Sequence, residues 1–124
     1  MKIGIDLDGT VYKSTTIIDN ARQALVDIGK DHEIYYLTNN SSKSPEQIVK
    51  KLSMLTDISI ASDKIVTPLL VSIRSLDKSK KIFLYGTEFM VNYMKQFNYN
   101  ITNTLEESDL LIIAGRPSMG KTAL

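Results

Sequence analysis

The stretch that decides the fold is Ile3-Gly4-Ile5-Asp6-Leu7-Asp8-Gly9-Thr10-Val11-Tyr12, an apolar strand pattern that ends in two aspartates followed by Gly-Thr. Successive side chains of a strand alternate between faces, so Asp6 and Asp8 share a face unless the chain turns directly after Asp6. Either arrangement crowds two carboxylates at the carboxyl end of a strand. At a separation of about 6 Å and an effective dielectric constant of about 20, their repulsion is roughly 3 kcal/mol, which a purely structural strand has no reason to carry.

A divalent cation would relieve this repulsion. The sequence has no cysteine and one histidine, His32, so the ligands on offer are hard oxygens, which favour Mg²⁺ over zinc or copper. We therefore predict a magnesium site at Asp6 and Asp8. The alternative is a strand that ends in an Asp-Gly turn, which explains Asp8 and Gly9 from local preferences but leaves Asp6 unexplained.

Composition sets wide limits on the class of protein. The 124 residues make one domain or part of one, with 43% hydrophobic and 23% charged residues and a net charge of +1. This charge gives no electrostatic reason for a nucleic-acid or membrane-surface partner. The lack of cysteine excludes a disulfide framework and thiol catalysis. Because Lys2 and Asp6 interrupt the amino-terminal segment and no apolar run approaches bilayer length, we expect neither a secretory signal nor a membrane span, and we predict a cytoplasmic protein.

Strand and helix patterns alternate along the chain. Apolar residues at helical spacing predict a helix from Ala21 that Gly29 stops, after a polar loop over 13–16. Ser44 as N-cap, with Pro45 at the first helical position, predicts a second helix. Further strands are predicted over 33–38, 81–85 and 110–114, and further helices over 68–76 and 88–97. This alternation predicts an α/β fold with a mostly parallel sheet and helices on both faces.

Two groups of side chains in this pattern are interpreted as structural and not as functional. The aromatic side chains of Tyr85, Phe89, Tyr93 and Phe97 follow helical spacing and are predicted to be core residues rather than a stacking platform. His32 and Lys43 are predicted to be surface residues.

A second polar cluster follows the predicted strand 33–38. In a parallel sheet, chemistry gathers beyond the carboxyl ends of the strands, so Thr38-Asn39-Asn40-Ser41-Ser42 opens onto the same edge as the two aspartates. The Thr38 hydroxyl and the backbone N–H groups after it can hold a phosphoryl oxygen. Taken alone, the cluster would be read as a polar strand-to-helix loop; its position opposite the aspartates favours the phosphate-binding interpretation.

The two segments DLDGTVY and LTNNSSKSPEQ resemble motifs I and II of the haloacid dehalogenase superfamily, and within it the class IIA branch of NagD-like and 4-nitrophenylphosphatase-like phosphatases. With the later KIFLYGTEFM segment, the resemblance covers about residues 1–113. It implies a Rossmann-like core and a Mg²⁺-dependent phosphomonoester hydrolase that acts on a small phosphorylated metabolite.

The resemblance also implies a role for each matching residue. Asp6 would be the nucleophile that forms an aspartyl-phosphate, and Asp8 would be the general acid and then the general base. Mg²⁺ would be held by the Asp6 carboxylate and the Asp8 main-chain carbonyl. The phosphate would be bound by the Thr38 hydroxyl and the Asn39 backbone, with Gly9 shaping the turn.

Two further elements of the family do not occur in this sequence: a third-motif lysine, and a Gly-Asp pair with another aspartate that completes the metal site. Glu106, Glu107 and Asp109 form the remaining acidic cluster, which we interpret as a solvated helix-to-strand corner. We therefore expect the chain to be the first half of a phosphatase, truncated before the cap and the second half of the core.

The end of the chain carries a separate signal. Residues 115–122, GRPSMGKT, match the phosphate-binding loop G-x-x-x-x-G-K-T, and the segment SDLLIIAGRPSMGKTAL resembles that of DnaB-type replicative helicases. We accordingly divide the chain into a hydrolase part, 1–108, which gives no reason for nucleic-acid binding, and a strand with a loop-like terminus, 109–124, at a fusion or truncation junction. Two alternative functions stay open: a fragment of a P-loop ATPase or helicase, which needs Gly120, Lys121 and Thr122, and a non-catalytic phosphate-binding remnant.

Overall fold

Residues 1–114 of the chain are described in a computed structural model, and they form two compact units. The first unit comprises residues 1–38 and 45–67, and the second comprises residues 39–44 and the chain from Pro68 onward. Each unit has a parallel three-stranded sheet and two α-helices, so the predicted α/β class with mostly parallel strands is confirmed.

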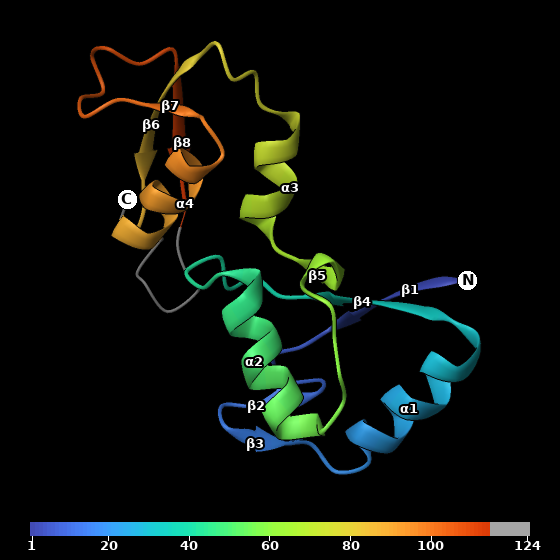
Figure 1. The fold of residues 1–124 in the computed structure, drawn as a ribbon. Coiled ribbons are helices and arrows are strands. Elements are labelled where there is room, and N and C mark those ends of the chain that lie inside the picture. The colour runs from blue at the N-terminus through green and yellow to red at the C-terminus, as the bar shows by residue number, and fades with distance from the viewer. Residues whose placement is uncertain (115–124) are drawn as a thin grey trace. The chain divides into compact units, whose positions relative to one another are not determined.

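The sheet of the first unit has the strand order β1-β4-β5 (Figure 1). Its strands are β1 (Lys2–Asp6), β4 (Glu33–Leu37) and β5 (Ile65–Val66). All pairs are parallel, and the register sets Asp6, the last residue of β1, opposite Leu37, the last residue of β4. The carboxyl ends of β1 and β4 therefore lie at one edge, where the sequence predicts the polar clusters.

Helices α1 (Ala21–Asp31) and α2 (Pro45–Thr56) and a short 3₁₀ helix, η1 (Ser62–Lys64), complete this unit. Helix α2 begins at Pro45, as predicted. The predicted end of α1 is wrong: Gly29 lies inside the helix, which ends where His32 becomes extended and donates its N–H to the Ile28 carbonyl. Gly29 does not stop the helix because it is not among the residues with positive φ, and strand β4 takes over directly at Glu33.

An antiparallel hairpin, β2 (Tyr12–Lys13) with β3 (Thr16–Ile17), replaces the polar loop predicted over 13–16. Its strands have two residues each, too few to show an alternating pattern in the sequence. Its turn has Ser14 at a φ of 56° instead of the glycine or Asn-Gly pair that indicates a tight hairpin in a sequence. The hairpin therefore carries no sequence signal of its own.

The core of the first unit gathers apolar side chains from its strands, its helices and the segment that follows β1. Leu7 and Leu52 are fully buried at its centre. The remaining buried members are Val11, Tyr12, Leu25, Ile34, Tyr36, Ile48 and Ile65. This packing fixes the segment after Asp6, because Leu7 and Val11 both point into the core on either side of Asp8.

The sheet of the second unit has the order β7-β6-β8, again all parallel. Its strands are β6 (Lys81–Tyr85), β7 (Asn100–Ile101) and β8 (Leu110–Ile113), and its helices are α3 (Pro68–Ser75) and α4 (Glu88–Gln96). Thr87 caps α4 by accepting the Met90 N–H on its side-chain oxygen. Strand β7 was not predicted, since a two-residue strand has no period to read.

The prediction that four aromatic residues form core is wrong for two of them. Tyr85 and Phe97 are 56% and 43% exposed, whereas Met90 and Met94 are the α4 side chains that are fully buried. Phe89, Tyr93 and Phe97 instead form a ladder along α4, with ring centroids 5.6 and 5.0 Å apart. The helical spacing holds for Phe89, Tyr93 and Phe97, which lie next to the buried methionines, but not for Tyr85, which ends strand β6.

No helix among residues 1–114 is long and apolar enough to cross a membrane.

Candidate functional site

The segment after β1 turns sharply and carries Asp8. The Leu7 N–H still donates to the Leu37 carbonyl at 2.9 Å, which extends the pairing of β1 with β4 by one residue. The Leu7 carbonyl then accepts the N–H groups of Thr10 and Val11 at 3.1 and 2.9 Å. Asp6 thus ends the strand and Asp8 begins the turn, and both aspartates are exposed.

Gly9 adopts the left-handed conformation that closes this turn. Its φ is +84°, and its N–H donates to the Tyr12 carbonyl at 2.8 Å. A Cβ at this position would meet no atom within 4 Å, so the backbone conformation, and not lack of space, favours glycine here.

Thr38 stands at the end of β4 and contacts Asp8 directly. Its N–H donates to the Val66 carbonyl at 3.1 Å, so its backbone is fixed by β5. Its side chain is buried, and its hydroxyl donates to Asp8 Oδ2 at 2.8 Å. The two polar clusters that the sequence assigns to one sheet edge therefore meet through this hydrogen bond.

Tyr12 is close to both aspartates and was not singled out from the sequence. Burial, and then the negative charges of Asp8 and Asp6, raise the pKa of Tyr12 to about 12. Both carboxylates thus interact electrostatically with the same phenol group. The Lys51 ammonium group of α2 lies 4.2 Å from the centroid of the Tyr12 ring.

Asn39, the remaining predicted phosphate-binding residue, belongs to the second unit and is exposed there. The loop 39–44 is shaped by its own side chains: Asn40 accepts hydrogen bonds from the N–H and hydroxyl of Ser42, and the buried Ser41 hydroxyl accepts the Leu69 N–H at 3.3 Å. Ser41 thus ties this loop to the first turn of α3.

Oxygen donors for a hard cation are present at Asp6 and Asp8. Among residues 1–114 there is no group of three or more histidine, cysteine, aspartate or glutamate side chains that could hold a metal ion. Glu106, Glu107 and Asp109 are exposed between β7 and β8, so the corner joins two strands and not a helix and a strand. Asp109 has a structural partner, because its carboxylate accepts the Lys81 N–H at 2.9 Å.

A hollow of about 440 Å³ lies at the opposite, amino end of β4. It is lined mainly by apolar side chains of α1, β4 and the segment before η1, with His32, Glu33 and Lys64 among its polar residues. Lys64 is paired with Glu33, and this hydrogen bond holds the pKa of the exposed Glu33 carboxyl below its usual value. None of the predicted site residues lines this hollow.

Comparison with known proteins identifies the family. The sequence model of the haloacid dehalogenase-like hydrolases matches residues 3–100. The chain belongs to this family. Its similarities to known phosphatases support the class IIA branch.

Among curated relatives, an acid sugar phosphatase of Staphylococcus epidermidis is 32% identical over 113 residues, which are 88% of this chain and 43% of the relative. The chain thus spans less than half the length of this relative.

Solved structures agree on the fold. The p-nitrophenyl phosphatase of Archaeoglobus fulgidus has a TM-score of 0.81 at 20% identity, covering 95% of this chain and 46% of that one. The glycerol phosphate phosphatase of Mycobacterium tuberculosis, solved in complex with magnesium, has a TM-score of 0.75 at 21% identity, covering 98% of this chain and 38% of that one.

These relatives are phosphatases and give no support to the helicase-like interpretation of the terminus. The segment 115–122 that carries it lies outside the described residues, as do Gly120, Lys121 and Thr122. The division into 1–108 and 109–124 stays a prediction.

Proposed function

We propose that this chain supplies the nucleophile and the phosphate-binding threonine of a Mg²⁺-dependent phosphomonoester hydrolase. The observation that carries the proposal is the 2.8 Å hydrogen bond from the Thr38 hydroxyl to Asp8 Oδ2, one turn beyond Asp6 at the carboxyl edge of the sheet. A buried hydroxyl donor beside two exposed carboxylates fits a site that handles a phosphoryl group and a proton.

In the proposed reaction, an Asp6 carboxylate oxygen attacks phosphorus while the bond from phosphorus to the ester oxygen breaks. Asp8, protonated at this stage, gives its proton to the leaving oxygen and releases the alcohol. Asp8 then takes a proton from a water molecule, which attacks phosphorus and breaks the bond to Asp6. Inorganic phosphate and free Asp6 result, so every proton that Asp8 gives up is recovered.

The donors fit a hard divalent cation held by the Asp6 carboxylate and the Asp8 main-chain carbonyl. When bound, the cation supplies charge that offsets the repulsion between a carboxylate and a phosphate dianion. The Thr38 hydroxyl would donate its hydrogen bond to a phosphoryl oxygen in place of Asp8, and the Asn39 backbone N–H would donate a second one. Gly9 keeps the turn in the conformation that exposes the Asp8 side chain.

A small phosphorylated metabolite is the proposed substrate. Support comes from the names of the relatives, which are an acid sugar phosphatase, a glycerol phosphate phosphatase and a p-nitrophenyl phosphatase. The net charge of +1 adds no reason to propose a nucleic-acid substrate.

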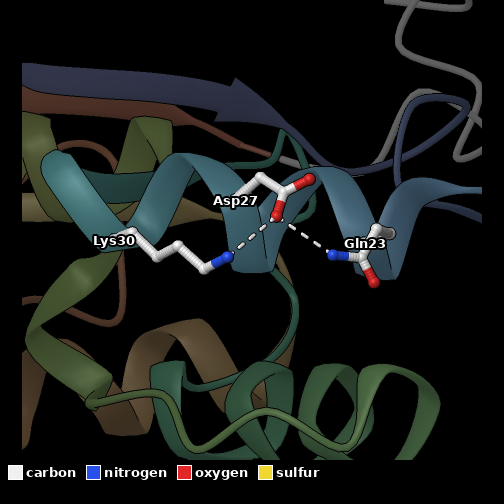
Figure 2. Close-up of polar contacts among 3 residues, drawn as sticks. All are labelled: Gln23, Asp27 and Lys30. Carbon is white, nitrogen blue, oxygen red and sulfur yellow. Dashed lines mark hydrogen bonds and ion pairs between the residues drawn. The ribbon is translucent and has the colours of Figure 1, made fainter.

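The test is Mg²⁺-dependent release of 4-nitrophenolate from 4-nitrophenyl phosphate by the parent chain and by Asp6→Asn. We expect slow release by the parent, because the third-motif lysine and the further aspartate are not in this sequence, and none above background by Asp6→Asn. Asp27→Asn is the matched control, since Asp27 lies exposed on α1, where its carboxylate accepts hydrogen bonds from Gln23 and Lys30 (Figure 2).

Equal rates in the parent and Asp6→Asn would overturn the proposal. Phosphate binding without any turnover, retained in Asp6→Asn, would favour the non-catalytic remnant instead.

A further inference from the structure

Tyr12 occupies a special place in the turn that carries Asp8. Its carbonyl accepts the Gly9 N–H at 2.8 Å, and its own backbone pairs with Ile17 in the hairpin β2–β3. Its side chain is 4% exposed and packs in the core of the first unit. Tyr12 therefore connects the turn, through its backbone, to the core of the first unit, through its ring.

Lys51 holds that ring from another element. Its ammonium group lies 4.2 Å from the ring centroid, within the range of a favourable cation–π contact, and its side chain is partly buried. Helix α2 also lies alongside β3, so Lys51 contacts Tyr12 where the helix meets the hairpin. No hydrogen bond joins the Tyr12 hydroxyl to another described residue, so the ring is held by its packing in the core and by its contact with Lys51.

From these contacts we propose that Tyr12 and Lys51 are a positioning pair for Asp8: Lys51 holds the Tyr12 ring against α2, and Tyr12 in turn fixes the Gly9 turn that orients the Asp8 carbonyl and carboxylate. This role rests on the proposed function, because the Asp8 carbonyl is one of the two Mg²⁺ ligands proposed above.

The first measurement is amide hydrogen exchange at Gly9 in the full chain. We expect Lys51→Met and Tyr12→Leu to exchange three- to tenfold faster at Gly9, since either change removes the cation–π contact. Lys51→Arg and Tyr12→Phe retain a cation and a ring, and both should exchange at the parental rate. The Leu7 amide is the internal control, because its bond to the Leu37 carbonyl belongs to the sheet and should stay protected in all four variants.

The second measurement is Mg²⁺ affinity by titration calorimetry, which separates positioning from mere support of the turn. Loss of a nearby positive charge would by itself tighten binding of a cation. A positioning role predicts the opposite for Lys51→Met, a three- to tenfold weaker affinity that Lys51→Arg restores. Tyr12→Leu should weaken binding likewise, and Tyr12→Phe should not.

The outcomes are distinguishable. Unchanged Gly9 exchange in Lys51→Met overturns the pair. Faster exchange with equal or tighter Mg²⁺ binding shows that the pair supports the turn without positioning Asp8, and also overturns it. If the parent chain binds no Mg²⁺, the proposed function and the positioning role are both overturned. If the parent binds Mg²⁺ and every variant has the same Mg²⁺ affinity, only the positioning role of the pair is overturned.

Discussion

The Thr38 hydroxyl and the Asp8 carboxylate form a 2.8 Å hydrogen bond that connects the segments following two neighbouring parallel strands. Asp8 is exposed and Thr38 is buried, so the acceptor of this hydrogen bond faces solvent while its donor is packed inside the protein. This arrangement gives the edge of the sheet a fixed hydroxyl next to a carboxylate that is open to a ligand.

Replacing Thr38 by valine removes this donor but keeps the shape of the side chain. We expect a loss of about 1 kcal/mol in the free energy of unfolding, because an exposed acceptor regains water and the buried residue loses its hydroxyl contacts. Urea denaturation measures the loss. Thr38→Ser retains the hydroxyl and is the control; a Thr38→Val chain as stable as the parent would show that the bond adds nothing to folding.

Replacing Asp6 by asparagine should weaken Mg²⁺ binding. The lost ligand is a full charge, so we expect roughly a tenfold lower affinity or more, about 1.4 kcal/mol. Isothermal titration compares the parent, Asp6→Asn and the exposed control Asp27→Asn. Equal affinity in all three chains would contradict a metal site at the end of β1.

Tyr12 should make the stability of the chain sensitive to alkaline pH. Its pKa rises from 10.0 to about 12 on folding, so the folded state favours the neutral phenol. The associated stability is complete below pH 10 and is lost as the pH rises through about 12.

Between pH 9 and pH 12, the free energy of unfolding of the Tyr12→Phe chain should therefore fall less than that of the parent. Tyr36, whose pKa is also raised by burial, is present in both chains and cancels in the comparison. Tyr85→Phe changes an exposed ring and is the control. Parallel stability curves for parent and Tyr12→Phe would refute the assignment.

The core of the first unit should depend strongly on Leu52, which has no exposed surface. Leu52→Ala deletes buried methyl groups and leaves a cavity, at a cost of roughly 2–5 kcal/mol. Met54→Ala, on the same helix but 76% exposed, should change the free energy of unfolding by less than about 0.5 kcal/mol. Thermal unfolding of the two variants tests this, and similar midpoints would show that α2 is not packed as described.

The parts of the fold that were predictable are those with a long local pattern. Strand β6 and the start of α2 at Pro45 coincide with the predictions, because a run of residues that favour strands and a capping signal identify them. The hairpin over 12–17 and strand β7 were missed, since each strand has only two residues. The end of α1 was wrong because a glycine in a sequence does not reveal whether its φ will be positive.

The candidate site divides in the same way. The Asp-x-Asp-Gly pattern and the position of Thr38 after a strand are local signals, and they correctly anticipate that Asp8 and Thr38 lie together. The contact of Lys51 with Tyr12 joins a helix to a hairpin far apart in the sequence, and its energy comes from packing geometry. No spacing rule identifies such a pair.

The Leu7 carbonyl gathers the N–H groups of Thr10 and Val11, and more distantly that of Tyr12 at 3.4 Å. These bonds belong to the main chain, so the identity of the side chain at position 10 has little bearing on them. Most side chains at that exposed position are therefore compatible with these main-chain bonds, with one exception. Proline brings no N–H, so a chain with proline there would lack the bond that begins the turn.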